Sequence, residues 1–387
     1  MTGSGTLLDP YIISDVNDLQ AMENDLTAYY ELANDIDASA TVGWNAGAGF
    51  APVGDSVNSF TGQLDGKGHT IDGLTINRPT TDGIGLIGYR GNNVVLANIK
   101  MTNCSIIGQG DVGCLAGDGV SGAGEITNCS STGTVTGTSV VGGLIGFGGV
   151  TTMEYCWSTC TVVGTGTSTG GLAADVSNCD VRYCSAAGNV TNTGIGVTQI
   201  GGLIGSFSHG SLLKSFATGD VSAANCDRVG GLVGNVNMAA EAFFIQDCYA
   251  RGAVIGNDRV AGLIGYIYRG NVDNCYSTGL VTGATNDGGL IGYRRVPILT
   301  PDDCTDCFWD TDTSGQAVSD GGTGKTTAQM KTASTFTDAG WDFTTIWDIT
   351  PSCNNDYPCL LDVTPACGVP VTPFVINKAY ALSREEL

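Results

Sequence analysis

Tyrosine and arginine side chains recur at one phase of this chain, in a pattern that could bind sugars. Aromatic rings stack on sugar rings, and the planar guanidinium of arginine forms paired hydrogen bonds with oxygen atoms. The chain has only 16 lysines and arginines against 38 aspartates and glutamates, so a local cluster of arginines is unusual. The residues that we expect to form this ligand-binding stripe are Tyr89, Arg90, Tyr266, Tyr268, Arg269, Tyr293, Arg294 and Arg295. The competing interpretation is that they are ordinary surface residues of strands.

Other residue patterns that carry chemistry are incomplete. The segment 319–327, SDGGTGKTT, lacks the first glycine of a phosphate-binding loop, and neither His69 nor His209 lies in a zinc-peptidase motif. Cys304 and Cys307 have no second pair at zinc-ribbon distance. We therefore predict no catalytic residue, no metal and no cofactor, although the acidic turns are compatible with an adventitious Ca²⁺. A carboxylate pair for glycoside cleavage would have to be assembled from distant parts of the chain, and the sequence nominates no such pair.

An internal repeat must position these residues. Variants of the sequence GGLIG recur, and their leucines are separated by 29, 29, 28, 31, 29, 31 and 27 residues. Short apolar runs between Gly, Asn, Ser and Thr predict strands and turns. One unit of about 29 residues cannot bury its apolar side alone, so we expect the units to stack as coils. The predicted leucine ladder consists of Leu86, Leu115, Leu144, Leu172, Leu203, Leu232, Leu263 and Leu290.

Cysteines predict a second ladder in the same coils. We expect one apolar slot per coil, filled by Cys104, Cys129, Cys156, Cys184, Phe216, Cys248, Cys275 and Cys307. A slot that accepts Cys or Phe is apolar, so these residues are predicted to be stacked buried thiols, not half-cystines. Another apolar position precedes the slot by three residues, which breaks the two-residue period of a strand and predicts a bend between them. Disulfide pairing among the last cysteines requires an oxidising environment, and the sequence does not assign it.

Together these patterns predict an all-β fold. It is a parallel β-solenoid of about eight repeat coils, with N-terminal coils and short capping helices. The predicted segments are an N-terminal cap with irregular coils (1–80), the repeat solenoid (81–310), a C-terminal capping segment (311–350) and a Pro/Cys-containing tail (351–387). Residues 14–25 suit a short helix with Ser14 or Asp15 as N-cap.

The charge and hydropathy of the chain argue against several partners. A net charge of −22 repels phosphates and anionic membranes, so we expect no nucleic acid. The chain contains no run of eighteen apolar residues, so we expect no membrane span. The first residues, MTGSGTLLDPYIIS, lack the features of a secretory signal. We therefore expect a chain released by lysis or carried on a particle, or one whose signal has been removed.

Three segments together resemble a known repeat family. Residues 268–292, YRGNVDNCYSTGLVTGATNDGGLIG, are similar to the GLUG repeat of bacterial and phage surface proteins. The head segment with FTGQLDGKGHTIDGLTI and the tail with FWDTDTSGQAVSDGGTGKTTAQMK extend the resemblance to roughly residues 3–350. The resemblance implies a right-handed parallel β-helix with a role in surface attachment, and it carries over no catalytic residue. GLUG repeats also occur in IgA-protease-like proteins, but the peptidase's zinc motif is missing from this chain.

These observations favour a non-enzymatic adhesion or surface-display protein. We expect it to present its solenoid to cell-surface glycans or another envelope component, in a virion or at an extracellular surface. The native-looking Met1 and the extra C-terminal peptide favour a phage fibre or decoration protein, with residues 369–387 as the anchor or the contact for self-assembly into a homo-oligomer. The alternatives are a secreted bacterial adhesin, a polysaccharide depolymerase on the same fold, and a purely structural spacer or filament subunit.

Overall fold

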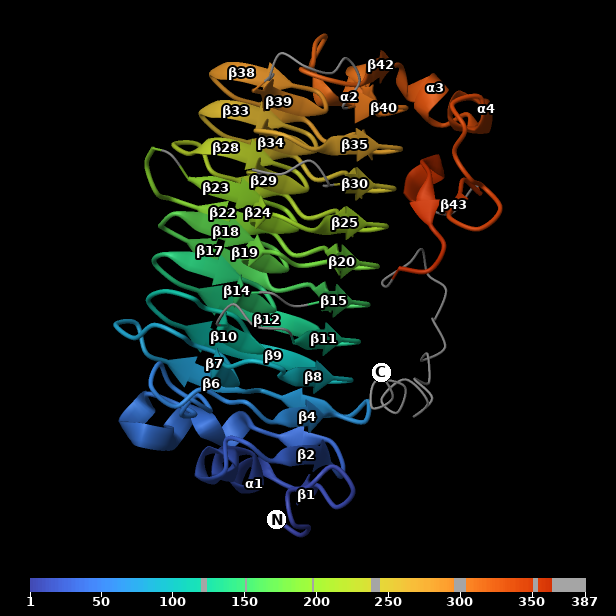
Figure 1. Ribbon diagram of the computed structural model, residues 1–387. Helices are drawn as coiled ribbons and strands as arrows, with labels where there is room; N and C mark the ends of the chain where they lie inside the picture. Colours follow the sequence, from blue (N-terminus) through green and yellow to red (C-terminus); the bar gives the residue numbers. More distant parts are fainter. Residues whose placement is uncertain are drawn as a thin grey trace.

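The chain winds into a stack of coils along one axis (Figure 1). A computed structural model describes residues 1–119, 124–149, 152–196, 198–237, 244–295, 304–350 and 354–363. Equivalent strands of successive coils pair in parallel along the stack, and the repeat contributes about eight coils. The predicted all-β parallel β-solenoid is confirmed.

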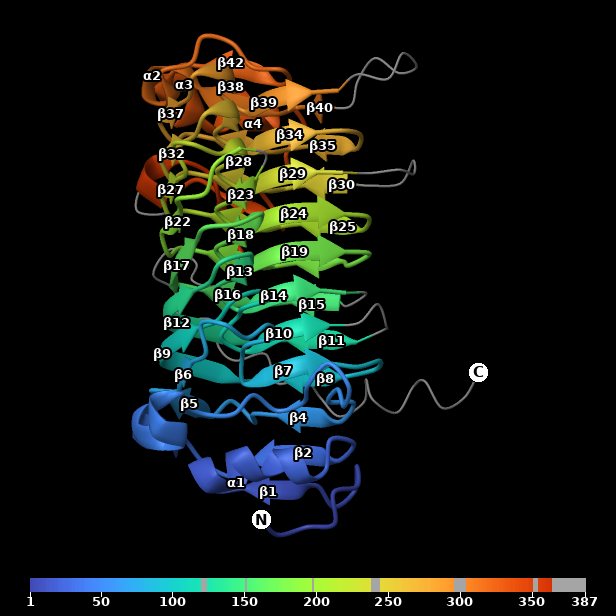
Figure 2. The ribbon, with the colours of Figure 1, turned by 90° about the vertical axis from the view of Figure 1, so that its left-hand side faces the viewer.

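Each repeat coil contributes strands to parallel sheets that run the length of the stack (Figure 2). The eleven-stranded sheet contains β1 (Tyr11–Ile13), β2 (Tyr29–Leu32), β4 (Gln63–Asp65), β8 (Val95–Ala97), β11 (Glu125–Thr127), β15 (Thr152–Glu154), β20 (Val181–Arg182), β25 (Ser211–Leu213), β30 (Phe244–Gln246), β35 (Asn271–Asp273) and β40 (Cys304–Thr305). The eight-stranded sheet contains β7 (Ile87–Arg90), β10 (Ala116–Gly119), β14 (Ile145–Gly148), β19 (Ala173–Ser177), β24 (Ile204–Ser208), β29 (Val233–Val236), β34 (Ile264–Ile267) and β39 (Ile291–Arg294).

Two further parallel sheets complete the walls of the solenoid. The six-stranded sheet contains β13 (Val140–Gly142), β18 (Ser168–Gly170), β23 (Gln199–Gly201), β28 (Asp227–Gly230), β33 (Asp258–Ala261) and β38 (Thr285–Gly288). The fourth sheet contains β3 (Ile36–Asp37), β5 (Thr70–Asp72), β6 (Thr75–Asn77), β9 (Lys100–Ile107), β12 (Ser130–Thr136), β16 (Trp157–Ser158), β17 (Thr161–Gly164), β21 (Ser185–Ala186), β22 (Val190–Asn192), β26 (Phe216–Ala217), β27 (Val221–Ser222), β31 (Tyr249–Ala250), β32 (Val254–Ile255), β36 (Tyr276–Ser277), β37 (Val281–Thr282), β41 (Phe308–Asp310) and β42 (Thr323–Lys325).

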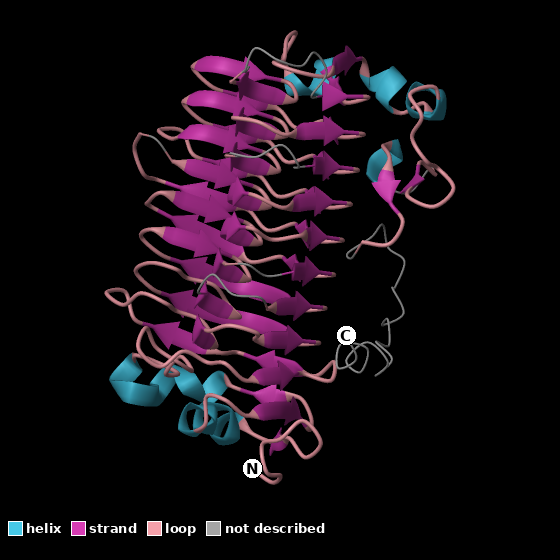
Figure 3. Cartoon of the chain, viewed as in Figure 1, coloured by secondary structure: helices cyan, strands magenta, loops and turns pink. Residues whose placement is uncertain are grey.

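Short helices lie toward the two ends of the chain (Figure 3). They are α1 (Val16–Gln20), α2 (Thr311–Ser314), α3 (Thr327–Met330) and α4 (Ala333–Thr337), with 3-10 turns η1 (Ala21–Asn24), η2 (Ser39–Gly47) and η3 (Asn354–Asp356). The predicted N-terminal helix is confirmed, because the Asp15 side chain caps α1 and both Leu19 and Met22 are fully buried.

The leucine ladder is confirmed as the inner spine of the repeat coils. All eight leucines are fully buried, and from Leu115 to Leu263 each backbone N–H donates to the carbonyl of the equivalent leucine in the next coil. The paired glycines before the leucine permit this close stacking. A Cβ at Gly202 would lie 2.1 Å from the Gly231 carbonyl oxygen of the next coil. Close approach of the coils, and not a left-handed backbone, therefore requires glycine at this position.

The cysteine ladder is confirmed in part, and two of its predicted members are wrong. Phe216 pairs with Ser185 and Tyr249, one position past the slot, and Ser215 fills the slot. Ser215 tolerates full burial because its hydroxyl accepts from the Cys184 N–H and donates to the Leu213 carbonyl. Cys184 lies twelve residues after Leu172, and Ser215 lies twelve residues after Leu203, so the spacing from the leucine identifies Ser215 as the slot residue.

Cys104 is also outside the predicted slot. Cys104 lies on the long strand β9 and pairs with Gly133. The slot of this coil is filled by Ile99, whose carbonyl accepts the backbone N–H of Ser130. Cys104 lies near Cys114 and Cys160 in the interior. Ile99 lies thirteen residues after Leu86, close to the twelve of Leu144–Cys156, so the spacing from the leucine leads to Ile99 and only the residue type suggested Cys104.

The bend predicted before the cysteine slot is confirmed by backbone geometry. The residue directly before the slot has a positive φ in every described coil: Asn98, Asn128, Tyr155, Tyr183, Lys214, Asp247, Asn274 and Asp306. Asn and Asp tolerate this left-handed conformation better than most residues, which explains their frequency there. The bend turns the apolar position before it and the slot after it toward the same interior.

Segments near both termini cover parts of the exposed sheet edges. At the N-terminal end, Thr2 pairs antiparallel with Ile12 of the first strand. At the other end, the Ser319 hydroxyl accepts the N–H groups of Leu290 and Ile291 at 3.2 and 2.8 Å. Such contacts occupy backbone groups that would otherwise recruit another strand.

A C-terminal strap, defined as residues 330–350 and 354–363, packs along the side of the solenoid (Figure 1). It includes the antiparallel pair β43 (Trp347–Asp348) and β44 (Cys359–Leu360). Beneath it, the rings of Phe216, Tyr249 and Tyr276 stack from coil to coil, and Phe308 occupies the equivalent position of the next coil. The Trp347 indole donates to the Asp247 carboxylate at 3.2 Å, and the Tyr357 hydroxyl donates to the Asp310 carboxylate at 2.7 Å. The strap thereby joins several coils directly.

The leucine ladder makes a first prediction about stability. Leu203→Ala should lower the free energy of unfolding by about 2–5 kcal/mol, because the coils on either side prevent the cavity from collapsing. Chemical denaturation followed by circular dichroism measures this change. Leu280→Ala, at a side chain that is 54% exposed, is the control and should stay within about 0.5 kcal/mol of wild type. Equal losses for the two variants would contradict the ladder as a main source of stability.

Candidate ligand-binding face

Two columns of residues follow the solenoid axis at the corner between the six- and eight-stranded sheets. The column of the eight-stranded sheet comprises the residues three positions past each ladder leucine: Tyr89, Asp118, Phe147, Asp175, Ser206, Asn235, Tyr266 and Tyr293. The column of the six-stranded sheet comprises Val140, Ser168, Gln199, Arg228, Arg259 and Asn286. We call the surface formed by the two columns the corner face.

Glycines on the eight-stranded sheet let the two columns meet. A Cβ at Gly265 would lie 2.6 Å from the backbone nitrogen of Val229, so a side chain there would push the sheets apart. Because glycine occupies this position, Tyr266 beside it reaches over Arg228. The last glycine of the GGLIG-type repeat thus determines which side chains share the corner.

An arginine–tyrosine cluster forms at the C-terminal end of the corner face, from Arg228, Asn235, Arg259, Tyr266 and Tyr293. The two tyrosine rings are stacked, with centroids 5.8 Å apart and planes 7° from parallel. The Arg228 guanidinium lies 4.7 Å from the Tyr266 centroid, and that of Arg259 lies 5.7 and 5.6 Å from the two ring centroids. Arg228 also donates to the Asn235 side-chain oxygen at 3.2 Å. Cation–π contacts therefore hold both guanidinium groups against the rings.

The two guanidinium groups differ in how their charge is compensated. Arg259 forms an ion pair with Asp258 at 3.2 Å. Among the described residues, no carboxylate oxygen lies within 4.0 Å of the Arg228 guanidinium nitrogens, so Arg228 forms no ion pair with them. Burial lowers the pKa of Arg228, and the nearby charge of Arg259 lowers it further. The cluster thus holds two adjacent positive groups with one carboxylate in direct contact.

A second group of the predicted stripe residues flanks this cluster. The Arg295 and Arg269 guanidinium groups lie 4.8 and 5.7 Å from the ring centroid of Tyr268, and both arginines are exposed. Arg294 is half-buried, and its backbone N–H donates to Asp320 at 2.5 Å. The C-terminal coils therefore carry a positive, aromatic surface in a strongly acidic protein.

The N-terminal end of the corner face has the opposite charge. Asp82, Asp118 and Asp175 are close enough to Asp111 to act on it electrostatically. Burial raises the pKa of Asp111 to about 6, with Asp118, Asp82 and Asp175 adding to the effect. Burial alone raises the pKa of Asp175 to about 6. The corner face is therefore acidic over its first coils and basic over its last ones.

Two predicted stripe residues lie at this acidic end, apart from the others. Tyr89 is half-buried, and burial together with Asp118 raises its pKa. Arg90 is only 4% exposed, and its guanidinium donates to the Phe147 carbonyl at 2.7 Å. The expectation that Arg90 belongs to an exposed stripe is wrong, because its side chain turns beneath Gly119 and satisfies backbone inside the stack.

The structure brings together Tyr266 with Tyr293, and Tyr268 with Arg269 and Arg295, as separate contact groups. Sequence reasoning missed Arg228 and Arg259, the two arginines that contact the stacked tyrosines. A signal was present, because the tripeptide Asp-Arg-Val occurs twice, at 227–229 and 258–260, three residues before the ladder leucine. It belongs to the neighbouring sheet, so only the corner geometry relates it to the tyrosines.

Over the described ranges, no group of three His, Cys, Asp or Glu side chains is placed to hold a metal ion. The helices of the same ranges are too short or too polar to cross a membrane. What the corner face offers chemically is guanidinium groups and phenol rings, which suit recognition of a polar ligand, while the buried Asn235 amide holds Arg228 from below.

Comparison with known families confirms the resemblance that the repeat indicated. The family model of the GLUG motif matches residues 256–282. Halomucin of Haloquadratum walsbyi is 32% identical over 337 residues, which cover 68% of this chain and 4% of halomucin. A protein of Evansella cellulosilytica, provisionally named a Gly-rich membrane protein, is 34% identical over 451 residues, covering 92% of this chain and 45% of its own length. The chain thus spans less than half the length of these curated relatives.

A solved structure shares the architecture. The crystal structure of a Bacteroides ovatus protein, provisionally named an immunoglobulin A1 protease, matches with a TM-score of 0.50 and 19% sequence identity. The match covers 93% of this chain and 94% of that one. At this identity the likeness concerns the fold alone.

The buried carboxylates of the corner face predict a pH-dependent stability. Their folded-state pKa near 6 lies above the ordinary value of 3.8, so these two groups favour the folded state most below about pH 4 and lose that contribution as the pH rises through 6. The double variant Asp111→Asn, Asp175→Asn should therefore have a higher Tm than wild type at pH 7.

The difference in Tm between this double variant and wild type should disappear near pH 4, which thermal unfolding at the two pH values measures. Asp55→Asn is a control of opposite sign, since backbone hydrogen bonds lower the pKa of Asp55. A gain in Tm that is the same at pH 4 and pH 7 would contradict an electrostatic origin.

Proposed function

We propose that this GLUG-motif chain is a surface attachment protein that binds envelope glycans through the arginine–tyrosine cluster. The solenoid acts as a rigid support, and the corner face presents the cluster to the polymer. The proposal concerns binding without cleavage. A phage fibre or decoration protein and a cell-surface adhesin would use such a face in the same way.

The observation that carries the proposal is the pair of stacked tyrosines flanked by two guanidinium groups. Phenol rings supply flat apolar area with a polar edge, which matches the alternating apolar faces and hydroxyl rims of sugars. Tyr293 is 38% exposed, so part of this platform is open to solvent. The names of the two relatives, halomucin and Gly-rich membrane protein, support a place at a surface.

Incubating the purified protein with a panel of bacterial envelope polysaccharides tests the proposal. We expect retention of at least one polymer and no new reducing ends in the same samples. Tyr266→Ala with Tyr293→Ala should weaken retention by between about fivefold and a hundredfold, since two aromatic contacts of about 0.5–1.5 kcal/mol each are lost and tenfold in affinity is about 1.4 kcal/mol. Tyr155→Asn, on another corner of the coil, removes an exposed stacked tyrosine at a left-handed position that asparagine (Asn128) occupies in the preceding coil, and should leave retention unchanged. Retention that both variants keep would overturn the assignment to this cluster.

A polysaccharide depolymerase is the second candidate, and one observation favours it. Asp111 and Asp175, whose pKa is raised to about 6 by burial, lie on the same face as the arginine–tyrosine cluster. A carboxyl group with such a pKa can act as a general acid near neutral pH. New reducing ends in the panel, lost in Asp111→Asn, would replace the binding proposal with this one.

The attachment of the protein to a particle is proposed separately. Residues 369–387, predicted as the anchor or assembly contact, lie outside the described residues. Deleting them should leave a folded chain that no longer assembles, as sedimentation would show. Assembly that persists after the deletion would contradict this role.

A further inference from the structure

We infer that the ligand of the corner face is an acidic glycan, whose carboxylate groups bind Arg228 and Arg259 while its sugar rings pack against the solvent-accessible parts of Tyr266 and Tyr293. This inference rests on the proposed glycan-binding function and specifies the chemistry of the polymer. It is carried by the charge balance within the cluster, the spacing of the two arginines and the opposite charge at the far end of the face.

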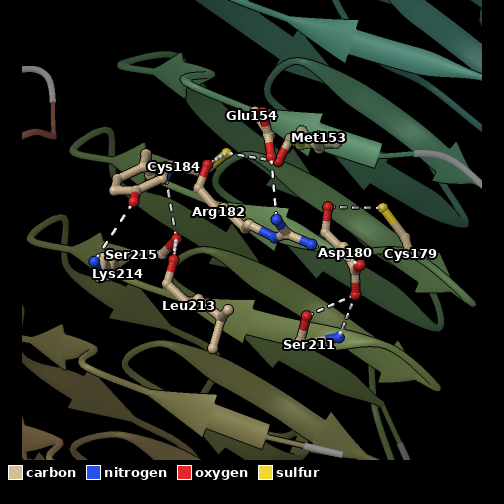
Figure 4. A network of polar contacts seen from close by, with 11 residues as sticks. Met153, Glu154, Cys179, Asp180, Arg182, Cys184, Ser211, Leu213, Lys214 and Ser215 are labelled. Atoms are coloured by element: carbon tan, nitrogen blue, oxygen red, sulfur yellow. Dashed lines mark hydrogen bonds and ion pairs between the residues drawn. The ribbon is translucent and has the colours of Figure 1, made fainter.

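The charge balance is best seen against another arginine of the same solenoid. Arg182, on the eleven-stranded sheet, lies between Glu154 and Asp180, at 3.6 and 2.9 Å from their carboxylate oxygens (Figure 4). Its charge is therefore matched within the protein. Arg228 has an amide, Asn235, as its hydrogen-bond acceptor, and its neighbour is a second guanidinium. One carboxylate, Asp258, pairs with Arg259, and Asp227 acts on Arg228 only beyond ion-pair distance. Two adjacent, partly desolvated cations with one directly paired carboxylate favour an anion from outside.

The direction of the cluster suits a polymer that runs along the solenoid axis. Arg228 and Arg259 occupy equivalent positions in neighbouring coils, as do Tyr266 and Tyr293. Parallel strands place such positions about 4.8 Å apart, a spacing close to the length of one sugar residue in a chain. Successive carboxylated sugars could thus meet successive arginines. The exposed Arg269 and Arg295 extend the positive surface beside this path.

The acidic end of the corner face limits where such a chain can bind. Asp82, Asp111, Asp118 and Asp175 lie there, with Asp175 two coils before Arg228 and the other three farther away. Ionised carboxylates repel a polyanion, so the binding site is confined to the last three coils. A neutral polymer would have no electrostatic reason to prefer that end. The polarity of the face therefore distinguishes an acidic ligand from a neutral one.

Backbone geometry indicates which substitution to use as a test. Arg228 and Arg259 have φ of 56° and 54°, in the left-handed region where alanine is strained. Asn286 occupies the equivalent position of the next coil with φ 52°, so asparagine is accepted there. Arg228→Asn with Arg259→Asn removes both charges at a conformation the fold already uses. Arg182→Asn is the matched control, because it removes an arginine whose charge is compensated by two carboxylates.

The experiment compares wild-type binding to polygalacturonate and to the same polymer after full methyl esterification, in about 150 mM salt, where distant charges are screened. We expect binding to polygalacturonate that is at least tenfold tighter than to the ester and is lost at least tenfold in the double asparagine variant, with Arg182→Asn unchanged. Dextran sulfate against dextran tests whether sulfate replaces carboxylate.

Each outcome of this comparison has a defined meaning. Equal binding to the acid and the ester, measured on wild-type protein, overturns the inference but leaves the proposed glycan binding intact. Selective binding that survives in the double asparagine variant also overturns it, because another site would then be responsible. Absence of binding to every polymer here and in the envelope panel contradicts the proposed function itself.

Discussion

In-register parallel pairing of equivalent residues from one coil to the next is the constraint on which this structure depends. A coil of about 29 residues has too little interior to be stable alone, so its leucine, valine and cysteine positions are buried by the coils above and below. Because the ladder leucines from Leu115 to Leu290 are joined through their backbones, a coil cannot shift without moving every side chain out of its layer. The glycines and the left-handed residues before the cysteine slot are the local conditions for this pairing.

The same pairing organises the surface. A residue on the outer side of a strand is aligned with its equivalents whatever its chemistry, so outer positions can vary while the interior stays regular. Two Asp-Arg-Val segments in neighbouring coils thereby place Arg228 and Arg259 one above the other. Where the corner glycines let the neighbouring sheet approach, the aligned tyrosines come within cation–π distance of these arginines. The polarity of the corner face, acidic at one end and basic at the other, follows from this freedom.

The C-terminal strap adds contacts of a different kind. In a stack of coils each unit touches only its neighbours, so the ends can open independently of the middle. The strap crosses several coils at once, and its tryptophans pack on the stacked rings of Phe216, Tyr249 and Tyr276. The hydrogen bonds from Trp347 to Asp247 and from Tyr357 to Asp310 link the same segment to coils two apart. These long-range contacts couple the last coils into one unit.

The sequence by itself determined the period, the leucine ladder, the bend before the cysteine slot and the fold class. A short repeated apolar pattern is buried only when the repeats stack on one another, so the pattern predicts the stack. It did not determine the register of every coil. Phe216 was assigned to a slot that Ser215 fills, since a polar residue gives no apolar signal when its hydroxyl is satisfied by backbone. It did not determine the candidate site either. Arg90 is recognisable as an arginine near a tyrosine, but only the packing decides that it is buried, and Arg228 belongs to the cluster only because two sheets meet at a corner lined by glycine. Periodicity reports which residues point inward, whereas contacts between different columns depend on how the chain turns between strands, and that is decided in three dimensions.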